Sequence, residues 1–326
     1  MSEELDRRSF LKTALAGSLI APLALSLEEK ALAAGASATI AQAAPSGEKM
    51  PQGVIGDVRM SRLICGGNLI SGYAHSRDLT YVSPLLTHYF TDEKIMETWA
   101  LCEQNGIDTM IAYPGDAHAI AVYQKYSDRG GKIRYLAQIG PTKKDLETVV
   151  RQAVDCGASG AFLVGNLGDE WTRDGDVALI GELLQNIKDN GLISGVAGHE
   201  LRTPMLVEKA GFAPDFYMKT LHSTNYWSHR QPEQKADVID NSRIDNYWCA
   251  NPEETIAFMR SVKRPWLAYK VLAAGAIQPE EGFRHAYENG ADFAVVGMFD
   301  FQIAEDARIA REILASKLNR ERPWYG

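Results

Sequence analysis

The 326-residue chain is long enough for one large domain or two small ones, and its 45% hydrophobic and 23% charged residues are typical of a globular protein with a packed core. A net charge of −8 argues against nucleic-acid binding, which usually needs a basic surface. Outside the N-terminal region the sequence has no run of about eighteen apolar residues, so we expect no permanent membrane span.

The N-terminus has the pattern of a targeting segment. The sequence RRSFLK at 7–12, followed by an apolar run, resembles a twin-arginine export signal, and small residues near Ala33 offer a cleavage site. We expect residues 1–33 to be a signal peptide that the twin-arginine export machinery recognises, and the mature protein to be periplasmic or otherwise exported. A cytoplasmic amphipathic arm is the alternative. Residues 34–56, rich in Ala, Ser, Pro and Gly, are predicted to be a flexible linker.

From residue 57 onwards, short β-rich runs alternate with longer helical patterns. Thr91 is predicted to cap a helix that ends at Gly106, and Thr142 a helix that ends at Gly157. Proline at the first helical position marks a further start after Asn251. The predicted strands begin near Arg62, Ile107, Ile133, Gly160, Leu192, Asp215, Trp266 and Asp292.

Strict alternation of strand and helix predicts parallel strands joined by right-handed crossovers. The closed arrangement is the α/β class (β/α)8 TIM barrel, and we expect residues 57–326 to form it as a single domain. The active site of such a barrel lies at the C-terminal ends of the strands. An open, doubly wound sheet is the alternative, but the first strand is not followed by the glycine-rich G-x-G-x-x-G turn.

Two consecutive predicted strands in the last third end in a lysine, a residue that is rarely buried unless it is paired. Side chains alternate along a strand. If Phe216, Met218 and Leu267 pack against the outer helices, Lys219 and Lys270 both turn into the barrel and lie side by side. Structural ion pairs with acidic residues are the alternative role for both lysines.

Other strand ends are predicted to bring polar residues to the same site. His199, Glu200 and His222 are the acid/base candidates, and they are also the candidate ligands of a divalent metal ion. A histidine that is hydrogen-bonded to the backbone is the alternative for each. The residues predicted to bind the substrate from strand ends are Asn68, Tyr113, Gln138 and Asn166.

Two long loops are expected to complete the site. The first contains residues 75–78, beginning with His75, and follows the first barrel strand. The second follows the sixth strand and repeats Asn-Tyr-Trp at 225–227 and 246–248. Loops of that length in a compact domain are usually functional. We expect the rings of Tyr226, Trp227, Tyr247 and Trp248 to stack on a sugar, or alternatively to bury the loop itself.

The last third resembles the deoxyribose-phosphate aldolase family of class I aldolases. The similarity rests on DFYMKT at 215–220, a second lysine at 270 followed by AAGAI, and GADFAVVG at 290–297. It implies that Lys219 is a Schiff-base lysine and that Lys270 is the cation that lowers the pKa of Lys219. It also implies that the backbone at Gly275 and Gly297 approaches an anionic group of the substrate.

The first half resembles the aldo/keto reductases. NGIDT at 105–109 with Tyr113 is similar to the segment that carries that family's aspartate and catalytic tyrosine, and LICGG at 63–67 lies where its first strand would be. The resemblance implies NADP as a cofactor and Tyr113 as an acid. Gln138 and Asn166, however, stand where that family has its lysine and histidine, so NADP is the less favoured cofactor.

The favoured function is that of a lyase or aldolase-type enzyme acting on a small, sugar-like carbonyl compound, with either no cofactor or a divalent metal. Three alternatives stay open. They are a metal-dependent sugar isomerase, epimerase or lyase, a divergent aldo/keto reductase-like oxidoreductase, and a non-catalytic carbohydrate-binding barrel.

Overall fold

The computed structural model describes residues 49–326 apart from residues 74, 77–78 and 242–247. All of the described residues belong to one compact unit, which extends to Gly326. The predicted signal peptide and most of the predicted linker therefore lie outside the described residues. Among the helices that the structure describes, none is long and apolar enough to cross a membrane.

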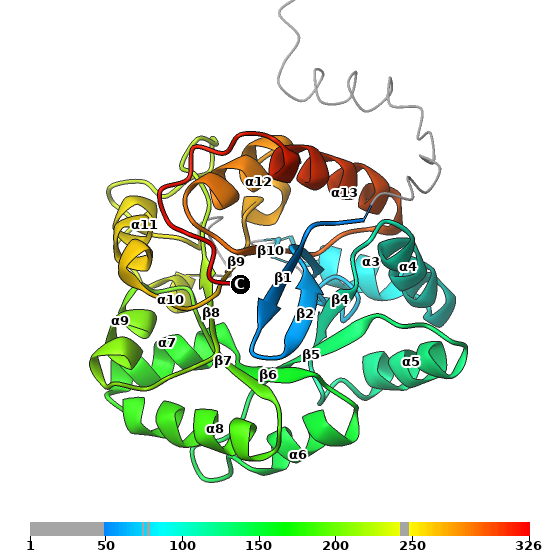
Figure 1. Ribbon diagram of the computed structural model, residues 1–326, viewed down its shortest axis with the longest axis horizontal. Helices are drawn as coiled ribbons and strands as arrows, with labels where there is room; N and C mark the ends of the chain where they lie inside the picture. The colour runs from blue at the N-terminus through cyan, green and yellow to red at the C-terminus, as the bar shows by residue number, and fades with distance from the viewer. Residues whose placement is uncertain (1–48, 74, 77–78, 242–247) are drawn as a thin grey trace, which may run out of the picture. The chain divides into compact units, whose positions relative to one another are not determined.

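Eight parallel strands close into a barrel, so the predicted TIM barrel is confirmed (Figure 1). Every residue of the second, fourth, seventh and eighth barrel strands is buried, as expected for strands covered on both faces. In barrel order the strands are β3 (Leu63–Cys65), β4 (Thr109–Ala112), β5 (Arg134–Ile139), β6 (Gly160–Leu163), β7 (Ile193–Gly198), β8 (Phe216–Thr220), β9 (Trp266–Tyr269) and β10 (Phe293–Val296), which pairs with β3.

Helices surround the barrel, and they connect each strand to the next (Figure 1). In the described part of the chain they are α3 (Val82–Tyr89), α4 (Asp92–Gln104), α5 (Ala117–Asp128), α6 (Thr148–Asp155), α7 (Gly165–Asp174), α8 (Val177–Asp189), α9 (Arg202–Lys209), α10 (Val238–Asn241), α11 (Pro252–Ser261), α12 (Pro279–Glu288) and α13 (Asp300–Ala315).

One predicted helix cap is confirmed and the other is wrong. Thr91 caps α4, because its hydroxyl accepts the N–H of Lys94 at 3.3 Å. Thr142 does not begin a helix. Its hydroxyl accepts the N–H of Asp145 in a turn, and the Asp145 carboxylate accepts the N–H of Thr148, where α6 begins. The two side chains accept different backbone N–H groups, and the one at the start of α6 is accepted by Asp145.

A short antiparallel hairpin closes the N-terminal end of the barrel. Its strands are β1 (Gln52–Ile55) and β2 (Val58–Ser61), joined by a two-residue turn in which Gly56 has a φ of 60°. Ile55 and Met60 pack into the barrel interior with residues such as Phe293. The predicted linker boundary at residue 56 is therefore too late, because residues 52–55 already belong to the folded domain.

The face of β8 and β9 that was predicted to pack against the helices is turned to the barrel interior, so the predicted orientation of these strands is wrong. Phe216, Met218 and Leu267 belong to the interior cluster. Tyr217 and Trp266 belong to the outer core under the helices. Alternation therefore directs Lys219 outward, away from the barrel axis.

Candidate active site

A cavity of about 1240 Å³ opens at the C-terminal ends of the barrel strands. The upper layer of interior side chains, including Met218 and Val295, forms its floor. Several residues predicted from the sequence line this cavity. They are Asn68, Tyr113, Gln138, Asn166, His199, Trp227, Trp248, Lys270, Gly275 and Gly297.

Lys270 reaches this cavity through an unusual backbone conformation. Its φ of 57° lies in the left-handed region, which residues other than glycine seldom enter. Alternation along β9 would turn Lys270 towards the helices, yet it lines the same cavity as its neighbour Tyr269. Ala273 and Ala274, in the turn that follows, also have positive φ values of 45° and 56°. Backbone strain of this kind is often found at functional sites.

The amine of Lys270 is held in an aromatic and uncharged setting. Its Nζ lies 5.0 Å from the ring centre of Trp248 and 6.0 Å from that of Tyr269. Nothing in the described part of the chain pairs Lys270 with a carboxylate. Desolvation lowers the pKa of Lys270 to about 7, since burial disfavours the ammonium form.

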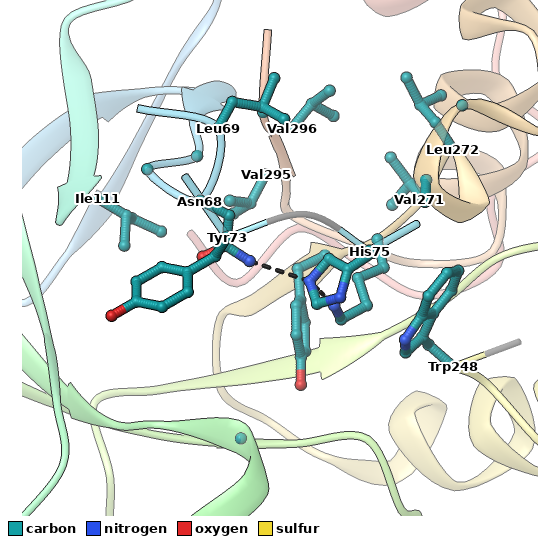
Figure 2. Close-up of a pocket in the computed structure, with 18 of the residues that line it drawn as sticks. Asn68, Leu69, Tyr73, His75, Ile111, Trp248, Val271, Leu272, Val295 and Val296 are labelled. Atoms are coloured by element: carbon teal, nitrogen blue, oxygen red, sulfur yellow. Dashed lines mark hydrogen bonds between the residues drawn. The ribbon is translucent and has the colours of Figure 1, made fainter. Parts of the chain in front are cut away.

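His75 is the polar partner of Lys270. Its Nε2 contacts the lysine Nζ and lies 3.0 Å from the Asn68 amide nitrogen (Figure 2). The ring packs edge-on against Trp248, with the centroids 5.4 Å apart. Burial and then the charge of Lys270 hold the pKa of His75 well below its ordinary value, so the imidazole is neutral near pH 7. Because His75 is neutral, it does not raise the pKa of Lys270 as a carboxylate would.

A second buried pair, Asp169 and His199, lies at the same cavity. Asp169 on α7 is fully buried, and its carboxylate contacts His199 Nδ1 at 2.9 Å. It also accepts the backbone N–H of His199 and of Glu200, and the hydroxyl of Thr203. This arrangement places the proton on Nδ1 and leaves Nε2 as the exchangeable nitrogen. Desolvation lowers the pKa of His199, although Asp169 opposes that effect.

Tyr269 completes the floor of the cavity beside His199. The two ring centroids are 5.3 Å apart, and a Cβ on Gly165 would lie 2.4 Å from the tyrosine oxygen. Glycine at 165, where α7 begins, is therefore the only residue that leaves room for this hydroxyl. Among the described residues, the Tyr269 hydroxyl has no hydrogen-bond partner. Burial raises its pKa well above the usual value, so the phenol stays protonated.

Lys219 lies behind the barrel wall and does not line the cavity. Its Nζ donates to the carbonyl of Thr220 at 3.1 Å and to the Thr220 hydroxyl at 2.9 Å, and it lies 4.0 Å from the Cys249 sulfur. Only 1% of the residue is exposed, so a small molecule in the cavity cannot reach it without rearrangement. Of the two predicted lysines, the structure brings Lys270 alone to the cavity.

The side chains of Glu200 and His222 form hydrogen bonds with backbone groups of neighbouring loops. Glu200 accepts the backbone N–H of Val238 at 2.7 Å. His222 is buried, with Nδ1 at the carbonyl of Ser223 and Nε2 accepting the N–H groups of Trp248 and Cys249. Both ring nitrogens of His222 are therefore occupied by the backbone, which corresponds to the alternative considered from the sequence.

The three predicted metal ligands are not gathered around one point. His199 directs Nδ1 to Asp169, while the nitrogens of His222 are bonded to the backbone. Within the part of the chain that the structure describes, no three or more His, Cys, Asp or Glu residues are arranged to hold a metal ion.

The aromatic loop is divided between the cavity and the core. Trp227 is 74% exposed at the cavity mouth, and Trp248 is buried with its ring over Lys270. Tyr226 is buried in a small cluster with Val238 and does not line the cavity. Tyr247 lies outside the described residues.

Sequence reasoning missed Asp169 and Tyr269 and gave His75 no defined role. Asp169 follows Asn166 by three positions, so a helix beginning directly after the fourth barrel strand would have placed it at the site. Tyr269 shares a face of β9 with Leu267, and that face is predicted from the sequence to pack against the outer helices. His75 was recognised only as part of a long loop, because its contacts with Asn68 and Lys270 exist only in the folded chain.

No protein-family model and no curated protein sequence matches this chain. Solved structures do match. A protein from Pseudomonas aeruginosa assigned to the aldo-keto reductases has a TM-score of 0.56 and 16% identity, over 85% of this chain and 98% of that one. A truncated 3-deoxy-D-arabino-heptulosonate 7-phosphate synthase from Thermotoga maritima has a TM-score of 0.46 and 12% identity, over 82% of this chain and 90% of that one.

The aldolase QR15 matches with a TM-score of 0.42 and 16% identity, over 71% of this chain and 94% of that one. The structure neighbours thus include both aldo-keto reductases and aldolases, and they are enzymes. At such low identities the similarity concerns the fold and leaves the reaction to be argued from the site. By its closed barrel, the chain is a member of the (β/α)8 fold class.

Proposed function

We propose that this protein is a lyase or aldolase-type enzyme that captures a small carbonyl compound on the amine of Lys270. The observation that carries the proposal is the setting of this amine, which is desolvated, faces the cavity and has only neutral neighbours. At pH 7 about half of an amine with a pKa of about 7 is neutral, whereas about one in three thousand ordinary lysines is. Only the neutral form attacks a carbonyl.

The reaction would begin with attack of the Lys270 nitrogen on the carbonyl carbon. The carbonyl oxygen takes up a proton, water leaves, and a protonated imine remains. That imine accepts the electron pair released when a neighbouring carbon–carbon bond breaks. His199, whose Nε2 is free to exchange a proton, is the acid/base candidate, and Asp169 keeps the ring in position.

The lining of the cavity supports a substrate without a phosphate group. Among the described residues that line the cavity, Lys270 is the only lysine and none is an arginine. Phosphate is often bound by paired cations. A neutral, sugar-like carbonyl compound fits this lining, with polar contacts available at Asn68, Gln138 and Asn166.

Reductive trapping tests the proposal. The protein is incubated with a panel of keto-sugars and small aldehydes, reduced with borohydride and mapped by mass spectrometry of its peptides. We expect a substrate-sized adduct on Lys270 that is absent from Lys270→Met and retained in Lys219→Met. An adduct on Lys219, or none on either lysine, would contradict the proposal. Thermal unfolding of each variant separates a lost amine from a lost fold.

We also propose that the chain is exported through the twin-arginine pathway, which the pattern at 7–12 supports. Fractionation of cells that produce the full chain should find it outside the cytoplasm, and replacement of Arg7 and Arg8 by lysine should retain it inside. Equal distribution of both forms would contradict export by this route.

A further inference from the structure

The cavity that contains Lys270 is also lined by residues of α3 and α13. We call this part the α3–α13 arm and define it by Val82, Leu86, Phe299, Gln302 and Asp306. The two helices are fastened to each other at their ends. The Tyr89 hydroxyl donates to Asp300, and the rings of Phe90 and Phe299 stack with their centroids 5.5 Å apart.

Asp306 is a buried carboxyl group that has no role in the proposed reaction. It lies on α13 with 3% of its surface exposed and lines the cavity. In the described part of the chain it makes no hydrogen bond or ion pair. Desolvation, with a smaller contribution from Glu305, raises the pKa of Asp306 to about 7. A buried polar group without a partner destabilises a fold, so its presence calls for a functional reason.

Gln302 lies one helical turn before Asp306, and residues at this spacing face the same side of a helix. The Gln302 Oε1 accepts the backbone N–H of Phe299 at 3.1 Å. Because only the oxygen of an amide can accept, this bond fixes the orientation of the side chain. The Nε2 group is then left as a donor at the cavity wall, without a partner among the described residues.

We propose that the α3–α13 arm is a second substrate subsite, in which an apolar segment packs against Leu86 and Phe299 and a hydroxyl group binds between Asp306 and Gln302. A hydroxyl can donate to the Asp306 carboxylate and accept from the Gln302 amide at the same time. An ammonium group would pair with Asp306 but would face the donor amide of Gln302, so the hydroxyl fits both side chains.

The inference rests on the proposed function, since it takes the carbonyl end of the substrate to lie at Lys270. The substrate class is then a carbonyl compound with an apolar middle and a hydroxyl group remote from the carbonyl. Lys270 and the α3–α13 arm line one continuous cavity, which allows a single molecule to reach both.

Trapping on Lys270 tests the subsite with ω-hydroxyaldehydes of increasing chain length and the matching plain aldehydes. At one chain length we expect the hydroxyl to lower the half-saturating concentration by about tenfold, the effect of one hydrogen bond to a charged group. Asp306→Leu and Gln302→Leu should abolish that advantage, measured in each variant as the ratio of the half-saturating concentrations of a hydroxyaldehyde and its plain counterpart. Glu312→Gln, which changes an exposed carboxylate farther along the same helix, is the matched control.

Thermal shift assays on Lys270→Met separate this inference from the proposed function. If no aldehyde forms an adduct, the proposed function fails. The subsite would still be supported if α,ω-diols raise the Tm of Lys270→Met. Adding Asp306→Leu to this variant should remove that rise in Tm. Stabilisation by diamines alone, or an equal effect of diols with and without Asp306, would overturn the hydroxyl subsite.

The stability of Asp306→Leu shows whether this carboxyl has only a structural role. The pKa of Asp306 is raised in the folded protein, so folding favours the protonated form, and wild-type stability falls as pH rises from about 4 to about 7. We expect Asp306→Leu to melt at a higher temperature than the wild type, by a margin that widens over this range. A lower Tm at every pH would overturn the functional assignment of Asp306.

Discussion

Replacement of His75 by glutamate is the sharpest test of how the site activates Lys270. His75 contacts the lysine Nζ and is neutral, so it leaves the pKa of Lys270 at about 7. A carboxylate within contact distance favours the ammonium form and shifts such a pKa by about 1 to 3 units. We therefore expect His75→Glu to raise the pKa of Lys270 and to lower the neutral fraction at pH 7 by roughly fivefold to five-hundredfold.

The assay is the rate of Lys270 acylation or reductive trapping as a function of pH, followed by peptide mass spectrometry. The wild type should show a midpoint near pH 7. His75→Gln keeps a hydrogen-bonding side chain without charge, so it is the matched control and should keep that midpoint. A wild-type midpoint near pH 10, or identical profiles for the glutamate and glutamine variants, would refute the reasoning.

Two further predictions concern the packing around the site. Burial lowers the pKa of His222 from 6.5 to about 4. As pH falls, the unfolded chain therefore binds a proton at His222 before the folded protein does. The free energy of unfolding of the wild type should decrease by up to about 3 kcal/mol between pH 6.5 and 4. Urea unfolding should show a smaller loss for His222→Gln, and equal slopes would contradict this account. Gly165→Ala would place a methyl group 2.4 Å from the Tyr269 hydroxyl and 3.0 Å from the His199 ring. We expect it to cost about 1–3 kcal/mol in stability and to slow trapping, whereas Gly140→Ala, whose nearest contact would be 3.8 Å, should do neither.

The sequence was sufficient to predict the barrel and the edge at which the site lies. Its strand starts agree closely with the observed strands, because short β-rich runs alternate with helical patterns in the local sequence. Polar residues at strand ends, such as Gln138 and Asn166, do line the cavity, since parallel strands bring their C-terminal ends to one rim. The hairpin at 52–61 was missed because the predicted linker extended to residue 56 and so included its first strand.

What the sequence could not determine is the face to which each strand-end lysine turns. Strand periodicity sorts Phe216 and Tyr217 onto opposite faces, but both faces of a barrel strand are buried, so an apolar pattern does not distinguish the interior from the helix side. The closed barrel turned Lys219 outward to Thr220. Lys270 lines the cavity because its backbone has a positive φ, and strand periodicity does not predict such a conformation. Residue types and their order along the chain determined the barrel and its functional edge, and three-dimensional packing decided which lysine the cavity holds.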